Sequence, residues 1–178
     1  MTFVAHRLAA PTLLACTWAL AGCAPTLDWR DVRPEGSGAR LQMPCKPSAQ
    51  RRDLPLAGAR VRLALHACAA GGQTWGLAFA DVSDPARVAP ALAELAAAAA
   101  ANLDARVAGA LPMQVPGATP NVNSARQRLQ GRMPDGKPVQ MQVAVFARGT
   151  LVFQASVLGE QVPDEAAQTF FASLRLGP

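Results

Sequence analysis

Apolar and polar residues alternate in the first half of the chain and predict three strands there. Residues 58–66 alternate, and residues 73–80 alternate again after the pair Gly71-Gly72. A period of two is typical of a half-buried strand, and the glycine pair predicts the turn that joins these two. A shorter strand at 40–43 ends at a corner that contains two prolines. We therefore expect a sheet to begin in this region.

A helical repeat of apolar residues replaces the alternation further along the chain. Asp84 can cap the first free N–H groups of a helix, and Pro85 suits its first turn, where a missing N–H is not needed. The alanine run at 96–101 favours helix and can lie close to a sheet. We expect this long helix to end at Gly109 and Pro112. Its apolar positions recur at helical spacing and are Val88, Leu92, Leu95, Ala99 and Leu103.

The second half of the chain has the pattern of two hairpins. Gly136 and Gly149 each stand where a bulged turn needs a left-handed residue. The strand pairs that follow from these turns are Arg128 with Gln142 and Val145 with Leu151. One face is then apolar and contains Leu129, Met141, Val143, Val145, Leu151, Phe153, Ala155 and Val157. The other face is polar and contains Arg126, Arg128, Gln130, Arg132, Gln140, Gln142 and Gln154.

A second helix is predicted to close the chain. Asp164 and Glu165 follow Pro163 and place two acids at the positive end of this helix. Its core-facing positions are Ala167, Phe170, Phe171 and Leu174. The order of strands, long helix, three strands and helix predicts an α+β fold. We expect an antiparallel β-sheet packed by a long central helix and a C-terminal helix.

The first residues have the pattern of a secretory signal. Arg7 precedes a short apolar run, which is followed by small residues, and this order is typical of a signal peptide. The four residues that close the run, Leu20-Ala21-Gly22-Cys23, resemble a bacterial lipobox. The resemblance implies cleavage before Cys23 and attachment of a diacylglycerol to its thiol, while an ordinary signal peptide cut elsewhere is the alternative. The expected organisation is a signal at 1–22, a lipidated tether at 23–38 and one domain at 39–178.

Composition narrows the chemistry that the mature chain could perform. Removal of 22 residues from 178 leaves 156, with 16 basic and 12 acidic residues and a net charge of +4. This excess is modest and scattered, so we expect no nucleic-acid partner. His66 is the only histidine after cleavage, so a catalytic triad could use no other, and an ordinary zinc site lacks ligands. We expect no enzyme, no metal and no cofactor.

Cys45 and Cys68 remain beside the lipidated cysteine and are predicted to form a disulfide. An even pair of cysteines in an exported chain favours a bridge over two buried thiols. A tight turn at Leu56-Ala57 would place the two cysteines opposite each other across the open end of a hairpin, within reach of a disulfide. The same register places Asp53 opposite Arg60. Such a bridge would add about 3 kcal/mol in the chain-entropy model.

The row Arg126, Arg128 and Arg132 is the most distinctive polar feature of the predicted sheet. A solvated sheet face explains it most simply. The alternative is a partner-binding face for an acidic protein or for lipid headgroups. We therefore carry these three arginines as the candidate partner-binding residues.

The order of these segments is similar to small uncharacterised Gram-negative lipoproteins with a PsbP-like fold. The resemblance rests on "MPCKP", "TWGLAFADV" and the closing "AAQTFFASLRL", and it carries no catalytic signature. It implies a binding or assembly module. We expect a non-enzymatic lipoprotein held by its lipid at the outer membrane, facing the periplasm, with an envelope protein as a candidate partner. A small-ligand or metal carrier is the second hypothesis, and a cryptic hydrolase is the third.

Overall fold

The computed structural model describes residues 26–177, which form an α+β fold with antiparallel sheets as predicted. The proposed signal and Cys23 lie outside the described residues. The strands are β1 (Arg30–Val32), β2 (Ala39–Met43), β3 (Ser48–Leu56), β4 (Ala59–Ala70), β5 (Gln73–Asp81), β6 (Arg106–Leu111), β7 (Ala125–Arg132), β8 (Pro138–Arg148), β9 (Leu151–Gly159) and β10 (Arg175–Leu176). The helices are the single 3₁₀ turn η1 (Pro85–Arg87), α1 (Val88–Ala101) and α2 (Asp164–Ser173).

Seven strands form the main sheet in the order β3-β4-β5-β9-β8-β7-β6, and every neighbouring pair is antiparallel. The pairing of β5 with β9 joins the first half of the chain to the second. A smaller sheet has the order β1-β2-β10. Because β10 pairs with β2, the end of the described chain is tied to its beginning.

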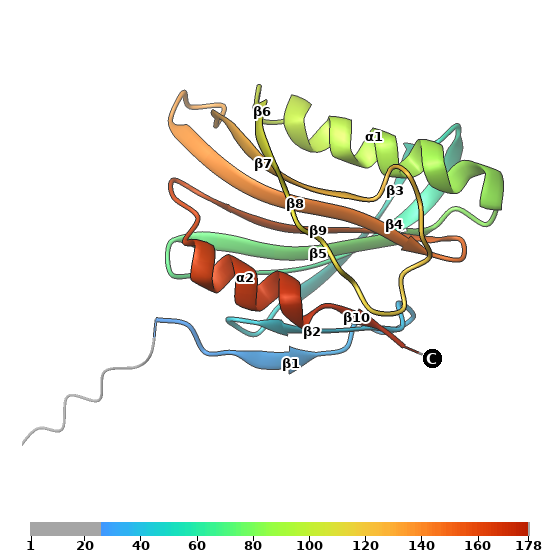
Figure 1. Cartoon of the computed structure of the whole chain (residues 1–178), viewed down its shortest axis with the longest axis horizontal. Coiled ribbons are helices and arrows are strands. Elements are labelled where there is room, and N and C mark those ends of the chain that lie inside the picture. The colour runs from blue at the N-terminus through green and yellow to red at the C-terminus, as the bar shows by residue number, and fades with distance from the viewer. Residues whose placement is uncertain (1–25, 178) are drawn as a thin grey trace, which may run out of the picture.

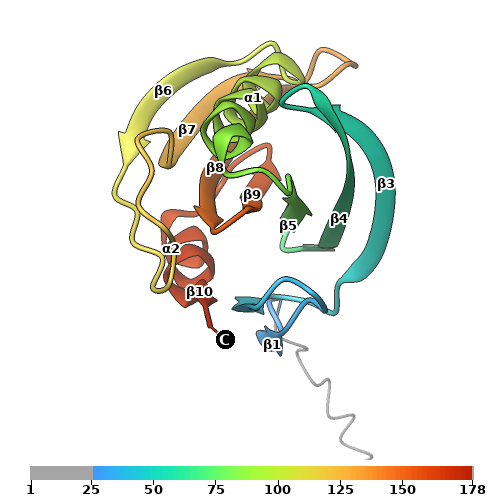
Figure 2. The same cartoon turned by 90° about the vertical axis from the view of Figure 1, so that its right-hand side faces the viewer.

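The main sheet is bent, and its two faces have different covers. Figure 2 shows α1 in the hollow of the bent sheet, with α2 and the smaller sheet on the outer side. Figure 1 shows α1 and α2 on opposite sides of the central strands. We call these the α1 face and the α2 face. The molecule thus has three layers, and both faces of the central strands are buried.

The α1 face is built from aliphatic side chains. Ala91 and Leu92 of α1 are fully buried against the sheet, and the small alanine side chains let the helix approach it closely. The cluster around this helix includes Leu56, Val61, Ala80, Val82, Val145, Ala147 and Val152. Toward the C-terminal end of α1 the cluster continues through Leu103, Leu129 and Val143.

Helix α1 ends at Ala101, earlier than the predicted end at Gly109. Asp104 has a φ of 45°, a left-handed conformation that no α-helix contains. The chain therefore turns away, and Arg106–Leu111 pairs with β7 as the edge strand β6. The predicted helix was too long because Leu103 continues the apolar spacing of the helix, although the backbone is no longer helical at that residue.

The register of the β7–β8 hairpin is confirmed, and that of the β8–β9 hairpin was wrong. Arg128 pairs with Gln142 as predicted. Val145 pairs with Gln154 and not with Leu151, because Arg148 already pairs with Leu151 around a two-residue turn. The turn brings Phe146 opposite Phe153, and their stacked rings have centroids 5.2 Å apart.

This register also corrects the predicted division into one apolar and one polar face. Residues 141–147 of β8 are all buried, so this strand is apolar on both sides. Val145 packs in the cluster on the α1 face, whereas Phe153 packs in the cluster on the α2 face. Since a helix covers each side of the central strands, neither side of β8 is left solvated, whereas β3 at one edge of the sheet is exposed over most of its length.

Cys45 and Cys68 form the predicted disulfide, with their Cα atoms 5.9 Å apart. The hairpin register is nevertheless shifted from the prediction. Leu56 pairs with Ala59, so the turn lies at Ala57-Gly58, where both residues have positive φ. Asp53 therefore pairs with Arg62 rather than with Arg60, and the two side chains form an ion pair of 3.0 Å. The disulfide closes the hairpin just beyond Ser48 and Ala67, the last residues that pair between β3 and β4.

Part of the predicted tether belongs to the folded domain. Strand β1 pairs with β2, and the ring of Trp29 packs edge-on against Trp75 with centroids 5.8 Å apart. The domain therefore begins before residue 39.

Candidate anion-binding site

The three candidate arginines lie at different depths below and beside α2. Arg126 is buried, with 6% of its surface exposed. Arg128 is half-buried and forms an ion pair with Asp164 at the start of α2. Arg132 is exposed at the end of the β7–β8 hairpin and donates to the carbonyl of Gly136. The row is therefore not one solvated face, because α2 covers its inner end.

A polar network connects the sheet to α2 around Arg126. Its Nη1 donates to Oε1 of Gln168 at 3.0 Å, and its Nη2 donates to Oε1 of Gln142 at 2.7 Å. The Nε2 group of Gln142, which is itself buried, donates to Oδ1 of Asp164 at 3.1 Å. The same carboxylate oxygen accepts from Nη2 of Arg128 at 2.6 Å. One acid thus serves two arginines, one directly and one through an amide.

The charge of Arg126 is not balanced by a carboxylate in direct contact. Both of its hydrogen-bond acceptors are neutral amides, and its Nε–H has no acceptor among residues 26–177. The ring of Phe171 lies under the guanidinium, 4.0 Å from its central carbon. A face of this kind attracts a cation but does not neutralise it. Buried charges are ordinarily paired, so this one is an exception that needs an explanation.

Burial lowers the pKa of Arg126, and repulsion from Arg128 lowers it further, while the Asp164 carboxylate raises it. An arginine keeps its proton in proteins in spite of such a shift. The site therefore keeps a positive charge in a buried position, where the loss of solvation destabilises the folded state. An anion bound beside Arg126 would offset part of that cost.

A pocket of about 550 Å³ opens beside Arg126. Its walls come from α2, from the start of β10 and from the segment 112–116, and they include Met113, Val115, Phe171 and Leu174. Gln114, Arg126, Gln168 and Arg175 bring polar groups to it. The lining combines apolar side chains with polar groups in equal measure, and an apolar wall beside polar groups that can fix orientation is typical of a ligand site.

The wall segment is held in place by the C-terminal strand. The N–H of Leu176 donates to the carbonyl of Pro116 at 2.8 Å. Gly117 has a φ of 83°, and a Cβ there would lie 1.8 Å from the carbonyl oxygen of Leu176. Only glycine fits this close crossing. The segment that forms the pocket wall therefore has a defined position.

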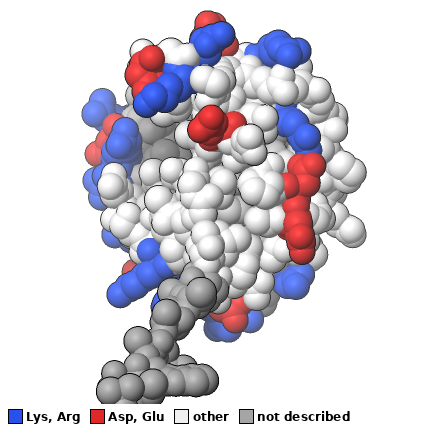
Figure 3. Space-filling view, turned by 90° about the vertical axis from the view of Figure 1, so that its left-hand side faces the viewer, with Lys and Arg blue, Asp and Glu red and all other residues white. Residues whose placement is uncertain are grey.

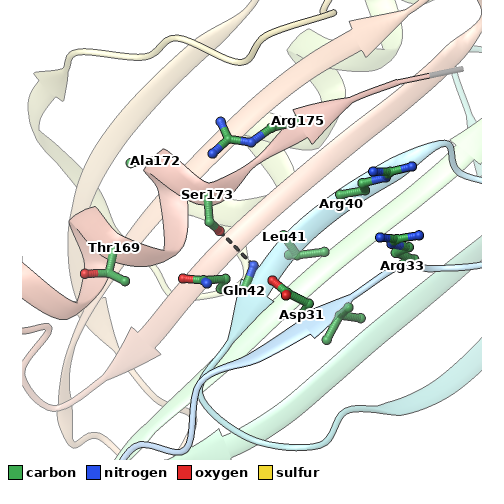
Figure 4. Close-up of a pocket in the computed structure, with 10 residues that line it drawn as sticks. Asp31, Arg33, Arg40, Leu41, Gln42, Thr169, Ala172, Ser173 and Arg175 are labelled. Atoms are coloured by element: carbon green, nitrogen blue, oxygen red, sulfur yellow. Dashed lines mark hydrogen bonds between the residues drawn. The ribbon is translucent and has the colours of Figure 1, made fainter.

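A second hollow, of about 540 Å³, lies on the other side of α2 and shares Ala172 and Arg175 with the pocket. Figure 4 shows Arg33 and Arg40 near each other in it, and Gln42 bonded to Ser173. The N–H of Gln42 donates to Oγ of Ser173 at 2.8 Å, which fixes β2 against α2. The arginines of this hollow are exposed, so water already solvates their charge.

The other candidate groups are dispersed. His66 is half-buried on β4 and its ring stacks on Phe79, with centroids 6.2 Å apart. Within residues 26–177 no three His, Cys, Asp or Glu side chains are grouped as a metal site would require. On the end of the molecule that lies at the left in Figure 1, acidic and basic side chains are scattered around the margin and few lie at the centre (Figure 3).

Sequence reasoning identified Arg126 but missed its depth. The signal that could have revealed it is in α2, where Asp164, Gln168 and Phe171 recur at positions i, i+4 and i+7. Residues at this spacing share one side of a helix. The two polar members of this stripe match the polar row of β7 and β8, and Phe171 lies under the guanidinium of Arg126. The wall segment had no such signal, because it has no regular pattern.

Comparison of the chain with protein-family models, with curated proteins and with solved structures gives no match. None of the helices in the described part of the chain has the length and apolar character needed to cross a bilayer.

Proposed function

We propose that this chain is a lipoprotein, anchored through Cys23 at the outer membrane and facing the periplasm, whose domain binds an anionic group. In this proposal the domain catalyses no reaction, and it acts as a binding or assembly module. The observation that carries the proposal is the buried guanidinium of Arg126, which has no carboxylate in contact and lines a pocket. Buried charges without a partner are costly, and they are concentrated at functional sites.

Two features of the chain support the proposed compartment. Leu20-Ala21-Gly22-Cys23 resembles a lipobox, and several acyl chains on one cysteine would hold a protein stably at a bilayer. The disulfide between Cys45 and Cys68 is of the kind that persists outside the reducing cytoplasm. We also propose that the domain is PsbP-like, because the order of its segments in the sequence resembles that fold.

The pocket supports a small-ligand carrier as the second candidate. Its volume of about 550 Å³ lies within the range of roughly 300–1,000 Å³ that is usual for small-molecule sites. A carrier and an assembly module would use the same guanidinium. They differ in whether the anion is free or belongs to another protein.

The anchor is tested by comparing the wild-type chain with Cys23→Ser in a Gram-negative host. We expect the wild-type protein in the outer-membrane fraction, with a mass that corresponds to loss of residues 1–22 and gain of acyl chains. Cys23→Ser should lose both properties. An unprocessed and unmodified wild-type chain in the soluble cell interior would overturn the anchor and the compartment together.

The binding role is tested by crosslinking in intact cells followed by mass spectrometry. Arg126→Gln removes the buried charge, and Arg132→Gln removes an exposed charge from the same strand as a matched control. We expect specific crosslinked products, protein or small molecule, that Arg126→Gln loses and Arg132→Gln retains. Identical products from both variants would contradict a binding role for Arg126.

A further inference from the structure

We infer that the Arg126 pocket takes a small free carboxylic acid, a carboxylate borne on an apolar body of several carbons. This inference rests on the proposed function, in which the pocket binds an anion, and it names the chemical class of that anion. Three properties of the pocket support it: the charge that the head group would balance, the way it would contact Arg126, and the apolar walls.

The unmatched charge at the site corresponds to one negative charge. Arg126 and Arg128 supply two positive charges near α2, and Asp164 supplies one negative charge. A carboxylate would complete the balance. A phosphate dianion carries more charge and more acceptor oxygens than a single buried guanidinium can match. The next cation at the pocket, Arg175, is exposed at its edge.

The position of Gln168 indicates how the head group would reach Arg126. Gln168 lines the pocket, whereas Gln142 lies behind the guanidinium in the buried network. Nη1 of Arg126 donates to Oε1 of Gln168 at 3.0 Å, and Gln168 is exposed on α2. Its side chain can therefore turn toward solvent and leave Nη1 to a carboxylate oxygen. The planar fork of a guanidinium suits a carboxylate, and a charged acceptor makes a stronger hydrogen bond than an amide.

The apolar part of the pocket lining favours an apolar body. Met113, Val115, Phe171 and Leu174 line the space beside Arg126, together with polar groups of Gln114, Gln168 and Arg175. If a methylene group is transferred from water to such walls, affinity rises about fourfold, which corresponds to ~0.8 kcal/mol. Affinity should thus increase steadily along a series of straight-chain acids until the pocket is filled. A site that recognised charge alone would not distinguish the members of this series.

Titration calorimetry on the full chain with Cys23→Ser, purified without detergent, tests the inference. The probes are acetate, butanoate, hexanoate, hexanol, hexyl phosphate, inorganic phosphate and a short peptide that ends in a free Phe carboxylate. We expect hexanoate to bind at least about tenfold more tightly than acetate. Hexanoate has four more methylene groups, and this figure assumes that each adds less affinity than full transfer from water would give. Hexanol, hexyl phosphate and inorganic phosphate should bind more weakly than hexanoate.

Variants of the same chain locate the binding. Arg126→Gln should weaken hexanoate binding at least about tenfold, as expected for loss of a hydrogen bond to a charged group, and Arg132→Gln should not. The length series on the unaltered pocket keeps the test decisive even where Arg126→Gln fails to fold. Gln168→Ala should retain hexanoate binding, since that side chain is displaced.

The outcomes separate the inference from the proposed function. Hexyl phosphate or inorganic phosphate binding through Arg126 as tightly as hexanoate would overturn the carboxylate class and leave the anion site standing. Binding of the peptide alone would overturn the free acid and favour a protein partner at the same site. Binding of no anion would overturn the site itself, and with it the inference.

Discussion

The α1 face and the α2 face of the seven-stranded sheet are each covered by a helix but are built from different residues. On the α1 face the buried cluster contains only Ala, Val, Leu and Met side chains. The buried polar side chains of the described chain are Ser37, Arg126 and Gln142, and the last two lie beneath α2. Figure 2 shows that the smaller sheet and the C-terminal strand gather on this outer side as well.

The difference indicates a division of roles between the two faces. An apolar face contributes to stability in proportion to the area that it buries. A buried charge adds nothing comparable, because its desolvation offsets much of what its contacts return. The α1 face therefore contributes to stability alone. The α2 face, whose cluster includes Trp75, Phe153 and Phe170, contributes to stability and also carries the groups that can bind.

Truncation of Leu92 on the α1 face should have the largest effect on stability among the variants considered. Leu92 is fully buried, and Leu92→Ala should lower the free energy of unfolding by about 2–5 kcal/mol through lost burial and a new cavity. Leu92→Met, which conserves volume, should cost less than about 1.5 kcal/mol. Denaturant titration measures both. Hexanoate affinity of the folded fraction should not change, and a large loss of affinity in Leu92→Ala would contradict the division of roles.

The wall of the pocket should be sensitive to a single methyl group. Gly117→Ala combines a positive φ with a clash against the carbonyl of Leu176, and strain of this kind costs about 1–3 kcal/mol. Gly136→Ala is the matched control, because Gly136 has almost the same φ, 84°, with nothing within 4 Å of the added group. We expect the Gly117 variant to be the less stable in denaturant titration and to lose ligand affinity. Equal effects of the two variants would show that the crossing does not position the wall.

Removal of the buried charge should change stability little. Arg126→Met eliminates an unbalanced cation, which favours the variant, but it leaves Oε1 of Gln142 without its donor, and an orphaned buried acceptor costs about 1–3 kcal/mol. We expect a net change within about 1 kcal/mol together with loss of anion binding. Adding Gln142→Leu should restore stability, because the orphaned group is then gone. A loss of more than about 3 kcal/mol in Arg126→Met alone would mean that the arginine is mainly structural.

The sequence predicted the strand pairing of the molecule only in part. The β7–β8 register followed from turn chemistry around Gly136. The disulfide followed from the even pair of cysteines expected in an exported chain, although the hairpin register predicted beside it was shifted. The β8–β9 register was missed because we assumed one apolar face, whereas residues 141–147 are buried on both sides. A strand pattern records which residues are apolar but not whether a helix covers its polar side.

The candidate site was predicted only in part, for the same reason. Arg126, Arg128 and Arg132 share a strand face by their spacing, as expected, but the depth of each depends on where α2 ends its contact with the sheet. The wall at 112–116 lies in a segment without periodicity, and its position depends on the contact of Gly117 with β10. Local patterns do not specify contacts between residues so distant in the chain.

The pH dependence of stability between about pH 5 and 7.5 should be the smallest of these effects, and it too belongs to the α2 face. His66 lies there beside Phe79, and its pKa is lowered from the ordinary value of 6.5, first by burial and then by Arg51. Since the unfolded chain binds this proton more tightly, the contribution to stability is fully present above the unfolded pKa and decreases as pH falls through that value. The decrease ends below the folded-state pKa.

Because His66 is half-buried, the effect should be small, and a matched variant is needed to isolate it. His66→Gln keeps a polar side chain of similar size and cannot titrate. Denaturant titrations of both proteins across this range should give a steeper loss toward low pH for the wild type. Parallel curves would show that burial beside Phe79 does not bias the protonation of His66. In that case the polar character of the α2 face would rest on Arg126 and its network alone.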